Sequence, residues 1–430
     1  ICPKGHASEA YFGRYFWDTE IYLLPFFLYT DPDHARDLLR FRINTLSGAR
    51  RNAARYGGAG ARFAWESSLS GDEECPNWQY ADHEIHVTAD IVYGVLQYVA
   101  ATGDESFLYE EAAPLVIETA RYLESRIDRT DGPHLLGVMG PDEYKPFSVD
   151  NAFTNRMARL ALESAAGLLH RLRSQQPDRY ETLVDELDLE DDESERFRQT
   201  AAELPVPFDE GRGIVLQSAD FLQYPPLEME GLPRPVAAHV PQELLYRRAA
   251  LKQADVVTML ALFPDDYPQD VVSRCFEFYE ARTTHDSSLS PTTHALVAAQ
   301  LRRAEQAAEF LGRSMEIDVG DGGGDASQGI HMANAGGTWL VVVAGLLGVR
   351  PSAEPSMLRI DPSLPAAVES IGTELHWRGA RVRVTAHHTA GGGIEVTVVH
   401  RGGPPVTMQL AGRHMVLEER ATLSRTVPEP

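Results

Sequence analysis

Cysteine is scarce in this chain, with three among 430 residues. Cys2, Cys75 and Cys275 are far apart and odd in number, and they form no CxxC or Cys/His pattern, so neither a disulfide framework nor a zinc site is indicated. His83 and His86 are three residues apart but lack a matching carboxylate or cysteine set. We therefore expect reduced thiols and no bound metal.

Long apolar runs are also missing. No stretch of about 18 apolar residues, the length that spans a bilayer, is present. The N-terminal stretch ICPKGHASEAYFGRYFWDTE has neither the basic-then-apolar pattern nor the cleavage site of a signal peptide. These absences predict a cytoplasmic protein without a membrane partner. The chain begins with Ile1 instead of Met, which leads us to expect a processed chain or a piece of something longer.

Positively charged residues are also few compared with negatively charged ones. The chain has 39 Lys+Arg against 63 Asp+Glu, a formal net charge of -24. A surface of that sign repels phosphate backbones and anionic lipid, so nucleic acid is not an expected partner. Hydrophobic residues make up 43% of the sequence, enough for a large core and for two or three domains.

Helical periodicity dominates from Asp18 to about Val349. In HEIHVTADIVYGVLQYVAATGD the apolar residues recur at intervals of three and four, and Gly103 supplies a helix stop. Short Gly-, Pro- or Asp-containing loops separate further segments of this kind and predict antiparallel helix pairs, together a toroid. These segments are 105–127, 154–173, 241–262, 268–282, 292–311 and 337–347, and the acidic stretch 185–196 is expected to be an exposed helix or insertion.

The sequence period changes from 3.6 to 2 after residue 350. TELHWRG, ARVRVTAHH, GIEVTVVH and VTMQLAG alternate apolar and polar residues and are separated by glycine, which is typical of short strands. We therefore predict a mainly α fold, with a helical domain over 1–350 and a small all-β domain over 351–430. No glycine-rich turn joins a strand to a helix, which argues against a Rossmann or P-loop protein.

The stretch GPDEY, followed by KPFSVDNAFTN, sets two carboxylates beside a Gly-Pro turn and just before an expected helix start. Taken alone, Asp142 and Glu143 fit a turn and an N-cap without catalytic meaning. Other motifs in the chain are needed before a catalytic interpretation is favoured.

Two Trp-carboxylate pairs, in FWDTE and ARFAWESS, suit a sugar, because a sugar stacks its CH face on a ring while carboxylates accept from its hydroxyls. LKQADVV adds a Lys-Gln pair before an apolar helix. Separately, these motifs fit buried Trp side chains, capping carboxylates and a solvated face. Together they predict a monosaccharide pocket. Its residues are Trp17, Asp18, Trp65, Glu66, Lys252 and Gln253.

THDSSLSPTTH and QGIHMANAGGTW carry groups that suit an anion. Ser287 and Ser288 can donate hydroxyl and backbone N–H groups to an oxyanion, and His331, close to Gly329, can donate to the same anion. The alternatives are a Ser/Thr turn before Pro291 and a core histidine. No GxSxG elbow is present, so a Ser/His/Asp triad is not indicated.

Taken in order, FWDTE, ARFAWES, GPDEY…VDNAFTN, KQADV, HDSSLS and GIH…GGTW resemble the motifs of the inverting disaccharide phosphorylases of glycoside hydrolase family 65, which include maltose, trehalose, kojibiose and nigerose phosphorylases. The resemblance runs from Tyr11 to the C-terminal strands. It implies an (α/α)6 barrel followed by a small β-sheet domain. It also implies a homodimer, an α-glucosyl disaccharide as substrate, and inorganic phosphate as co-substrate with no further cofactor.

The resemblance also implies the role of each motif. Glu143 is the expected general acid, and the donor glucose lies against the six pocket residues. Phosphate, held by Ser287, Ser288, Gly329 and His331, would attack C1 and release β-glucose 1-phosphate and the acceptor. Since phosphate is itself the nucleophile, no catalytic base is needed, in contrast to an inverting hydrolase.

The chain departs from the family pattern in several places. Arg14 stands where the family usually has His, Ala64 where it has Pro, and Lys145-Pro146 where His commonly follows GPDEY, which puts the acceptor in doubt. Family proteins carry an N-terminal β-sandwich before the barrel, and we expect this part to be absent from this chain or supplied separately. Two alternatives therefore stay open: an inverting α-glucoside hydrolase of the same fold, and a non-catalytic sugar-binding remnant.

Overall fold

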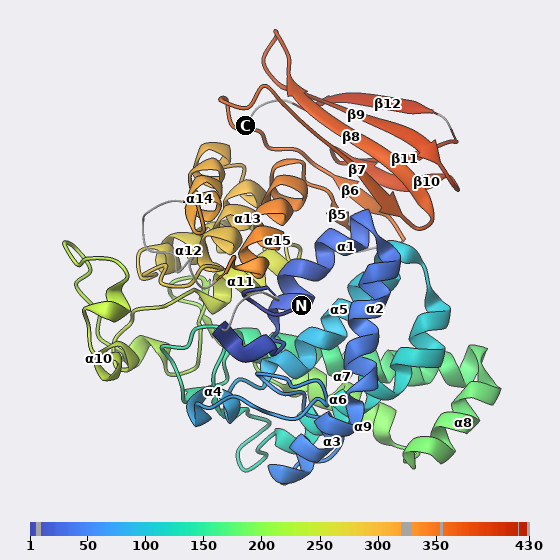
Figure 1. Cartoon of the computed structure of the whole chain (residues 1–430), viewed down its shortest axis with the longest axis vertical. Coiled ribbons are helices and arrows are strands. Elements are labelled where there is room, and N and C mark those ends of the chain that lie inside the picture. Colours follow the sequence, from blue (N-terminus) through green and yellow to red (C-terminus); the bar gives the residue numbers. More distant parts are fainter. Residues whose placement is uncertain (6–9, 320–328, 353–355, 420, 428–430) are drawn as a thin grey trace.

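The computed structural model describes residues 1–5, 10–319, 329–352, 356–419 and 421–427. Helices fill the chain as far as residue 346, and strands predominate after residue 350 (Figure 1). The prediction of a helix-rich fold with a small C-terminal β-sheet region is confirmed. Within the described ranges, no helix is both long and apolar enough to cross a membrane.

The helices vary in length from one turn to more than six. Three π-helical segments adjoin them: η2 (Thr19–Leu23) leads into α1, η3 (Phe107–Ala112) leads into α6, and η7 (Val341–Leu346) follows α15. The α-helices are α1 Leu24–Thr30, α2 Pro32–Asn44, α3 Leu46–Arg55, α4 Trp78–Ala81, α5 His86–Thr102, α6 Ala113–Arg126, α7 Ala152–Gln175, α8 Pro177–Leu187, α9 Glu193–Glu203, α10 Gln242–Tyr246, α11 Asp255–Leu262, α12 Gln269–Glu280, α13 Ser290–Gln300, α14 Ala304–Glu316 and α15 Met332–Leu340.

Neighbouring helices in the sequence are also neighbours in space. Helix α5 packs against α6 and α7, α7 against α11, α11 against α13, and α13 against α14 and α15. The last helix, α15, returns to pack against η2 and α1 at the start of the chain. The helical array therefore closes on itself, and the N-terminal end lies near its middle in Figure 1.

Several sequence-predicted boundaries are accurate. Helix α5 ends at Gly103, whose φ of 74° is the left-handed C-cap that glycine adopts without strain. The expected helix at 241–262 is wrong in its middle. There the backbone runs alongside residues 282–284: the N–H of Leu251 donates to the Arg282 carbonyl at 3.0 Å, and the N–H of Thr284 donates to the Leu251 carbonyl at 2.8 Å. Because these groups bond across the fold, the helix breaks into α10 and α11.

The strands form two small hairpins within the helical part and two four-stranded sheets after it. One sheet has the order β12-β9-β8-β7 and is antiparallel throughout, and the other has the order β11-β10-β6-β5 with β10 and β6 parallel. The strands are β1 Leu136–Val138, β2 Ser148–Val149, β3 Phe208–Asp209, β4 Ile214–Val215, β5 Arg350–Pro351, β6 Leu358–Ile360, β7 Ser370–Trp377, β8 Ala380–His388, β9 Ile394–Gly402, β10 Val406–Leu410, β11 Arg413–Leu417 and β12 Thr422–Val427.

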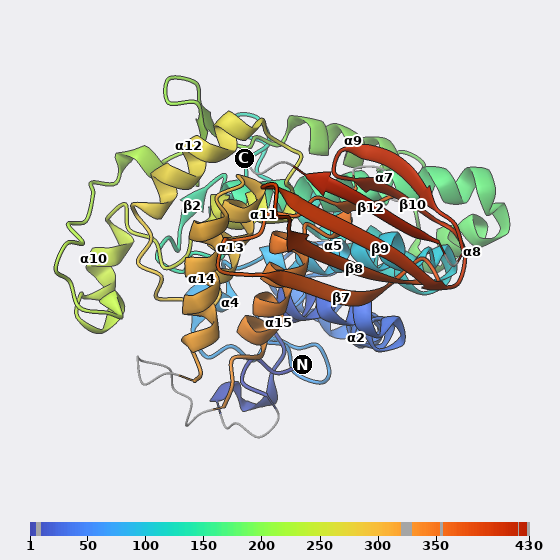
Figure 2. The same ribbon diagram turned by 90° about the horizontal axis from the view of Figure 1, so that it is seen from above.

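The two C-terminal sheets lie against one side of the helices (Figures 1 and 2). Strand β7 packs on α1 and α5, where the buried Trp377 ring stacks on Tyr29 with centroids 6.5 Å apart. The next residue, Arg378, donates its backbone N–H to the Ala101 carbonyl at 2.6 Å. Apolar side chains of both sheets and of the helices belong to one continuous core. The division at residue 350 as a domain boundary stays a prediction.

Candidate active site

The GPDEY stretch lies in the loop that joins β1 to β2. These strands pair antiparallel, with Val138 opposite Ser148, so the loop leaves and re-enters a short hairpin. Two residues after β2, Asn151 caps α7, accepting a hydrogen bond from the Thr154 N–H at 3.0 Å. The expected turn and helix start are both present, and between them the loop presents Glu143 to a cavity.

Asp142, the neighbour of Glu143, is fully buried and holds the loop in place. Its carboxylate accepts from the backbone N–H of Lys252 at 2.7 Å and from the side chain of Gln217 at 2.8 Å. Its own N–H donates to the buried Asp255 carboxylate at 2.6 Å. Burial raises the pKa of both carboxyl groups. Asp142 therefore has a structural function, whereas Glu143 is part-exposed beside the cavity.

A cavity of about 350 Å³ brings most of the predicted site residues together. That volume is within the usual range for small-molecule pockets. Gly329 is described but does not line the cavity, so its contact with phosphate stays a prediction. The predicted residues on its wall are Trp17, Asp18, Trp65, Glu66, Glu143, Lys252, Gln253, Ser287, Ser288 and His331.

Other wall residues were not singled out from the sequence: Pro3, Tyr11, Phe16, Asn77, Tyr80, Asp286 and Leu289. Tyr11, Phe16 and Asp286 adjoin or fall within quoted motifs, so their neighbours could have indicated them. Asn77 and Tyr80 come from the start of the one-turn helix α4, where the sequence has no periodic or motif signal.

Lys252 and Gln253 connect the loop that carries Glu143 with the loop that carries Ser287 and Ser288. The Lys252 ammonium lies 2.8 Å from the Glu143 carboxylate. Burial alone lowers the pKa of Lys252, but the Glu143 carboxylate outweighs this and raises it above its usual range. Gln253 donates to the Pro141 carbonyl at 2.6 Å and accepts from the Ser287 hydroxyl at 3.0 Å. One dipeptide therefore fixes both sides of the cavity.

Two tryptophans form an aromatic wall. The Trp17 and Trp65 rings are 27° from parallel, with centroids 6.5 Å apart. Both are largely buried, so only their edges or part of their faces meet the cavity. Beside Trp17, burial raises the pKa of the Asp18 carboxyl to about 7. Beside Trp65, Glu66 pairs with Arg14 at 2.7 Å.

A buried ionisable group supports this wall from behind. His86 makes edge contacts with both tryptophan rings at centroid distances of 5.1 and 5.5 Å. Its Nδ1 lies 2.6 Å from Asp90 and its Nε2 3.3 Å from Glu84. Burial opposes charge on the imidazole, but the two carboxylates outweigh it and raise the pKa of His86 to about 10. Sequence reasoning considered His86 only as a metal ligand and missed this network.

The side of the cavity expected to hold phosphate carries hydroxyl and imidazole groups. The Ser287 hydroxyl accepts from the Leu289 N–H at 3.2 Å, a turn at the start of α13. His331 lies at the start of α15, and its Nδ1 is 2.7 Å from Asp318 and 3.2 Å from the Lys4 ammonium. The His331 imidazole can donate a hydrogen bond to an oxyanion, and the Ser287 hydroxyl can do so once it turns away from Gln253.

The family departures at Arg14 and Lys145 have different structural consequences. Arg14 contacts Glu66 on the cavity wall. Lys145 is buried and does not line the cavity: its ammonium donates to the carbonyls of Tyr144, Leu245 and Ala250 at 2.9, 3.1 and 2.9 Å. Lys145 thus anchors the Glu143 loop to α10 and the segment after it, and does not line the cavity.

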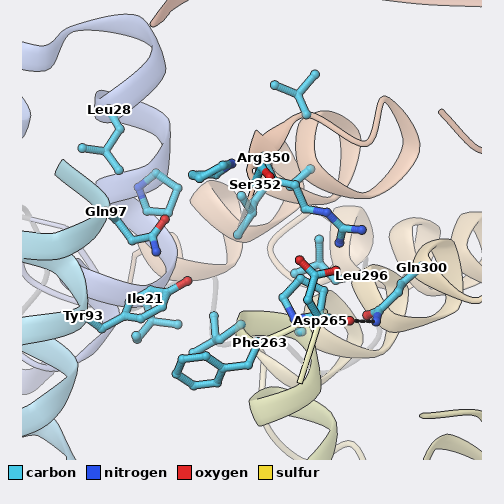
Figure 3. A pocket seen from close by; sticks show the side chains of 18 of the residues that line it. Ile21, Leu28, Tyr93, Gln97, Phe263, Asp265, Leu296, Gln300, Arg350 and Ser352 are labelled. Carbon is cyan, nitrogen blue, oxygen red and sulfur yellow. Dashed lines mark hydrogen bonds between the residues drawn. The ribbon is translucent and has the colours of Figure 1, made fainter. Parts of the chain in front are cut away.

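A second pocket, of about 290 Å³, lies between the helices and β5 (Figure 3). Two of its polar groups are already engaged: Asp265 pairs with Arg359 at 2.9 Å, and Gln300 donates to the Pro264 carbonyl at 2.8 Å. None of the residues predicted for the site lines this pocket. We therefore place the candidate active site in the cavity beside Glu143.

Comparison with known families matches residues 1–340 to the glycosyl hydrolase family 65 central catalytic domain and residues 354–417 to the family's C-terminal domain. The kojibiose phosphorylase of Caldanaerobacter subterraneus subsp. tengcongensis is 33% identical over 97% of this chain and 56% of its own length. The 1,2-alpha-glucosylglycerol phosphorylase of Bacillus selenitireducens is 34% identical over 99% of this chain and 58% of its own length.

A solved structure, described as a candidate kojibiose phosphorylase from human microbiome, shares the fold, with a TM-score of 0.90 at 24% identity over 99% of this chain and 62% of that chain. The chain spans little more than half the length of the curated relatives it matches. Both domain matches and the relatives confirm the resemblance seen in the motifs. The chain therefore belongs to glycosyl hydrolase family 65.

Proposed function

We propose that this protein catalyses phosphorolysis of an α-glucosyl disaccharide or a related α-glucoside, with inversion, to β-glucose 1-phosphate and a free acceptor. The observation that carries the proposal is the content of one cavity: a loop carboxyl group, a tryptophan wall with carboxylates, and a serine-histidine face. The carboxyl group and the tryptophan wall suit a glycoside, and the serine-histidine face suits an inorganic anion. The two named relatives act on different glucosides, kojibiose and 1,2-alpha-glucosylglycerol, which supports the reaction class without fixing the acceptor.

In the proposed mechanism, the donor glucose lies against Trp17 and Trp65, and Glu143 donates a proton to the glycosidic oxygen. A phosphate oxygen, held by Ser287, Ser288, Gly329 and His331, attacks C1 from the opposite face. The bond from C1 to the acceptor oxygen breaks as the bond to phosphate forms, so the configuration at C1 inverts. A proton of the attacking hydrogen phosphate returns to the Glu143 carboxylate and completes the cycle.

Lys252 has a defined part in this mechanism. Its ammonium at 2.8 Å stabilises the Glu143 carboxylate, the form that remains after proton transfer. Asp18, Glu66 and Gln253 would accept or donate hydrogen bonds at the sugar hydroxyls. Asp286 also lines the cavity, but its carboxylate is engaged by the Tyr144 hydroxyl and by two backbone N–H groups, which makes it unsuitable as a free base for water.

We infer that the closed helical array is an (α/α)6 barrel, an assignment that the return of α15 to η2 and α1 supports. The cavity then lies at its mouth, where the loops after β1 and before α11 and α13 converge. Homodimer formation and a cytoplasmic location stay predictions.

The test is incubation of the full chain with a panel of α-linked glucose disaccharides and glucosylglycerol, with and without inorganic phosphate. We expect β-glucose 1-phosphate only when phosphate is added. Glucose release independent of phosphate would instead indicate the hydrolase alternative.

Glu143→Gln should lower turnover by at least about 100-fold, because general acid catalysis typically contributes that much, while donor binding measured by calorimetry persists. Glu395→Gln, on strand β9, is the matched control and should keep full turnover. Binding without turnover in both the parent chain and the control would indicate a sugar-binding remnant.

A further inference from the structure

A cluster of three potential metal ligands lies behind the serine loop. Glu280 is the last residue of α12, His285 belongs to the loop that follows, and His294 lies in the second turn of α13. The Glu280 Oε2 is 3.2 Å from the Nε2 of His285 and 3.2 Å from the Nε2 of His294. All three ligand atoms lie within 4.8 Å of one another.

Ser290 contacts the Nδ1 atoms of both histidine rings, the nitrogens that do not face Glu280. His294 Nδ1 lies 2.9 Å from the Ser290 carbonyl, and His285 Nδ1 lies 2.9 Å from the Ser290 hydroxyl. A carbonyl oxygen can only accept, so His294 carries its proton on Nδ1. This leaves the Nε2 lone pair of a neutral His294 directed at the cluster, the arrangement found behind metal-bound histidines.

The contact between His294 Nε2 and Glu280 Oε2 therefore brings two acceptors together. Within the described part of the chain, three atoms make no hydrogen bond: the Nε2 of His285, the Nε2 of His294 and the Oε2 of Glu280. The His294 side chain is fully buried, so bulk water does not reach this contact. A cation shared by the three atoms resolves it without charging the ring.

The two separations from Glu280 suit such a cation. Donors bound to zinc at about 2.0–2.2 Å in a tetrahedron lie roughly 3.3–3.6 Å apart, slightly more than the two 3.2 Å separations. The Glu280 side chain is 29% exposed, although its Oε2 is itself buried, so the cluster lies close to the surface. The nearby Arg313 is already paired with Glu309 at 2.6 Å.

We propose that Glu280, His285 and His294 bind one divalent transition-metal ion, with Zn²⁺ favoured by two imidazole nitrogens and one carboxylate oxygen. The ion would be structural. It would tie the end of α12 to α13. It would also fix the loop in which Ser287 and Ser288 follow His285. The φ of His285 is 55°, which is uncommon for a residue other than glycine. The proposal is independent of the reaction proposed above.

The test uses the full chain, loaded with Zn²⁺, dialysed and analysed for metal by mass spectrometry. We expect about one zinc per chain, and a melting temperature that falls when a chelator removes the metal and recovers when Zn²⁺ is added back. A parent chain that retains no zinc above the buffer level would overturn the proposal.

Glu280→Gln keeps the side-chain size but removes the anionic ligand, and His294→Ala removes a buried one. We expect each to weaken zinc affinity by at least about 10-fold, measured by competition with a fluorescent chelator, and to abolish the chelator effect on melting. His387→Ala is the matched control, because His387 lies 3.4 Å from Glu395 in an exposed pair on the sheet. If His294→Ala does not fold, Glu280→Gln decides: unchanged zinc affinity in that variant contradicts the proposal.

Discussion

At the scale of single residues, lysine is confined to the surroundings of one cavity. The sequence contains lysine only at positions 4, 145 and 252, and arginine supplies the other cations. Lys4 contacts His331, and Lys252 pairs with Glu143. Lys145 anchors the loop that carries Glu143. An ammonium is a compact donor that can satisfy three acceptors at once, as Lys145 does with three carbonyls. Arginine or histidine could not replace it there without new contacts.

Asp18 supports a prediction about pH. Burial raises the pKa of its carboxyl from 3.8 to about 7, so the folded protein binds this proton more tightly than the unfolded chain. The stabilisation is complete below about pH 4 and is lost as the pH rises to about 7. We expect the melting temperature of the parent chain, relative to that of Asp18→Asn, to be higher at pH 5 than at pH 8. A difference that does not change with pH would contradict this assignment.

At the scale of elements, the loop that carries Glu143 depends on a close approach between segments far apart in the sequence. Asp255 opens α11, Asn151 caps α7, and both side chains lie against Gly140 at the start of GPDEY. A Cβ at Gly140 would overlap the Asp255 carboxylate and the Asn151 amide. The glycine of the motif is therefore needed for packing space, while Asp142 supplies the bonds.

Replacement of this glycine should show the effect. Gly140→Ala forces a shift of buried groups, and we expect a loss of about 1–3 kcal/mol in the free energy of unfolding, the usual range for overpacking. Gly167→Ala is the control, because this position lies on the exposed face of α7 with no atom within 4 Å of the added Cβ. It should be neutral or stabilise by up to about 1 kcal/mol. Calorimetric melting of both variants gives the comparison, and equal effects would argue against the crowding.

At the scale of the whole molecule, the sheets and the helices share one core, and Trp377 is central to their contact. Its ring is 1% exposed and stacks on Tyr29 of α1. Loss of such a side chain costs the burial of its surface and leaves a cavity.

We expect Trp377→Ala to lower the free energy of unfolding by about 3–5 kcal/mol, and the helical circular dichroism to melt earlier, because the cavity opens in the shared core. Val416→Ala, at a 51% exposed position of β11, should change melting little. Helices that melt at an unchanged temperature in Trp377→Ala would mean that the sheets and the helices unfold separately.

Local patterns in the sequence determined much of the architecture. The strand predicted at ARVRVTAHH matches β8, Ala380–His388, because alternation and flanking glycines act within a few residues. Gly103 ends α5 for an equally local reason. The order of the motifs was enough to identify the family, and each conspicuous Trp-carboxylate pair lines the cavity.

Contacts between distant segments were decided only by the tertiary structure. The break before α11 follows from hydrogen bonds between Leu251 and residues 282–284, which no local pattern encodes. The pairing of Lys252 with Glu143 and the contribution of α4 to the cavity arise in the same way. The expectation of no metal, which rested on ligands closely spaced in the sequence, stays untested; the cluster of Glu280, His285 and His294 is formed by the α12–α13 turn. Spacing along the chain fixes what one helix or strand presents, and packing across the fold fixes which of these groups meet.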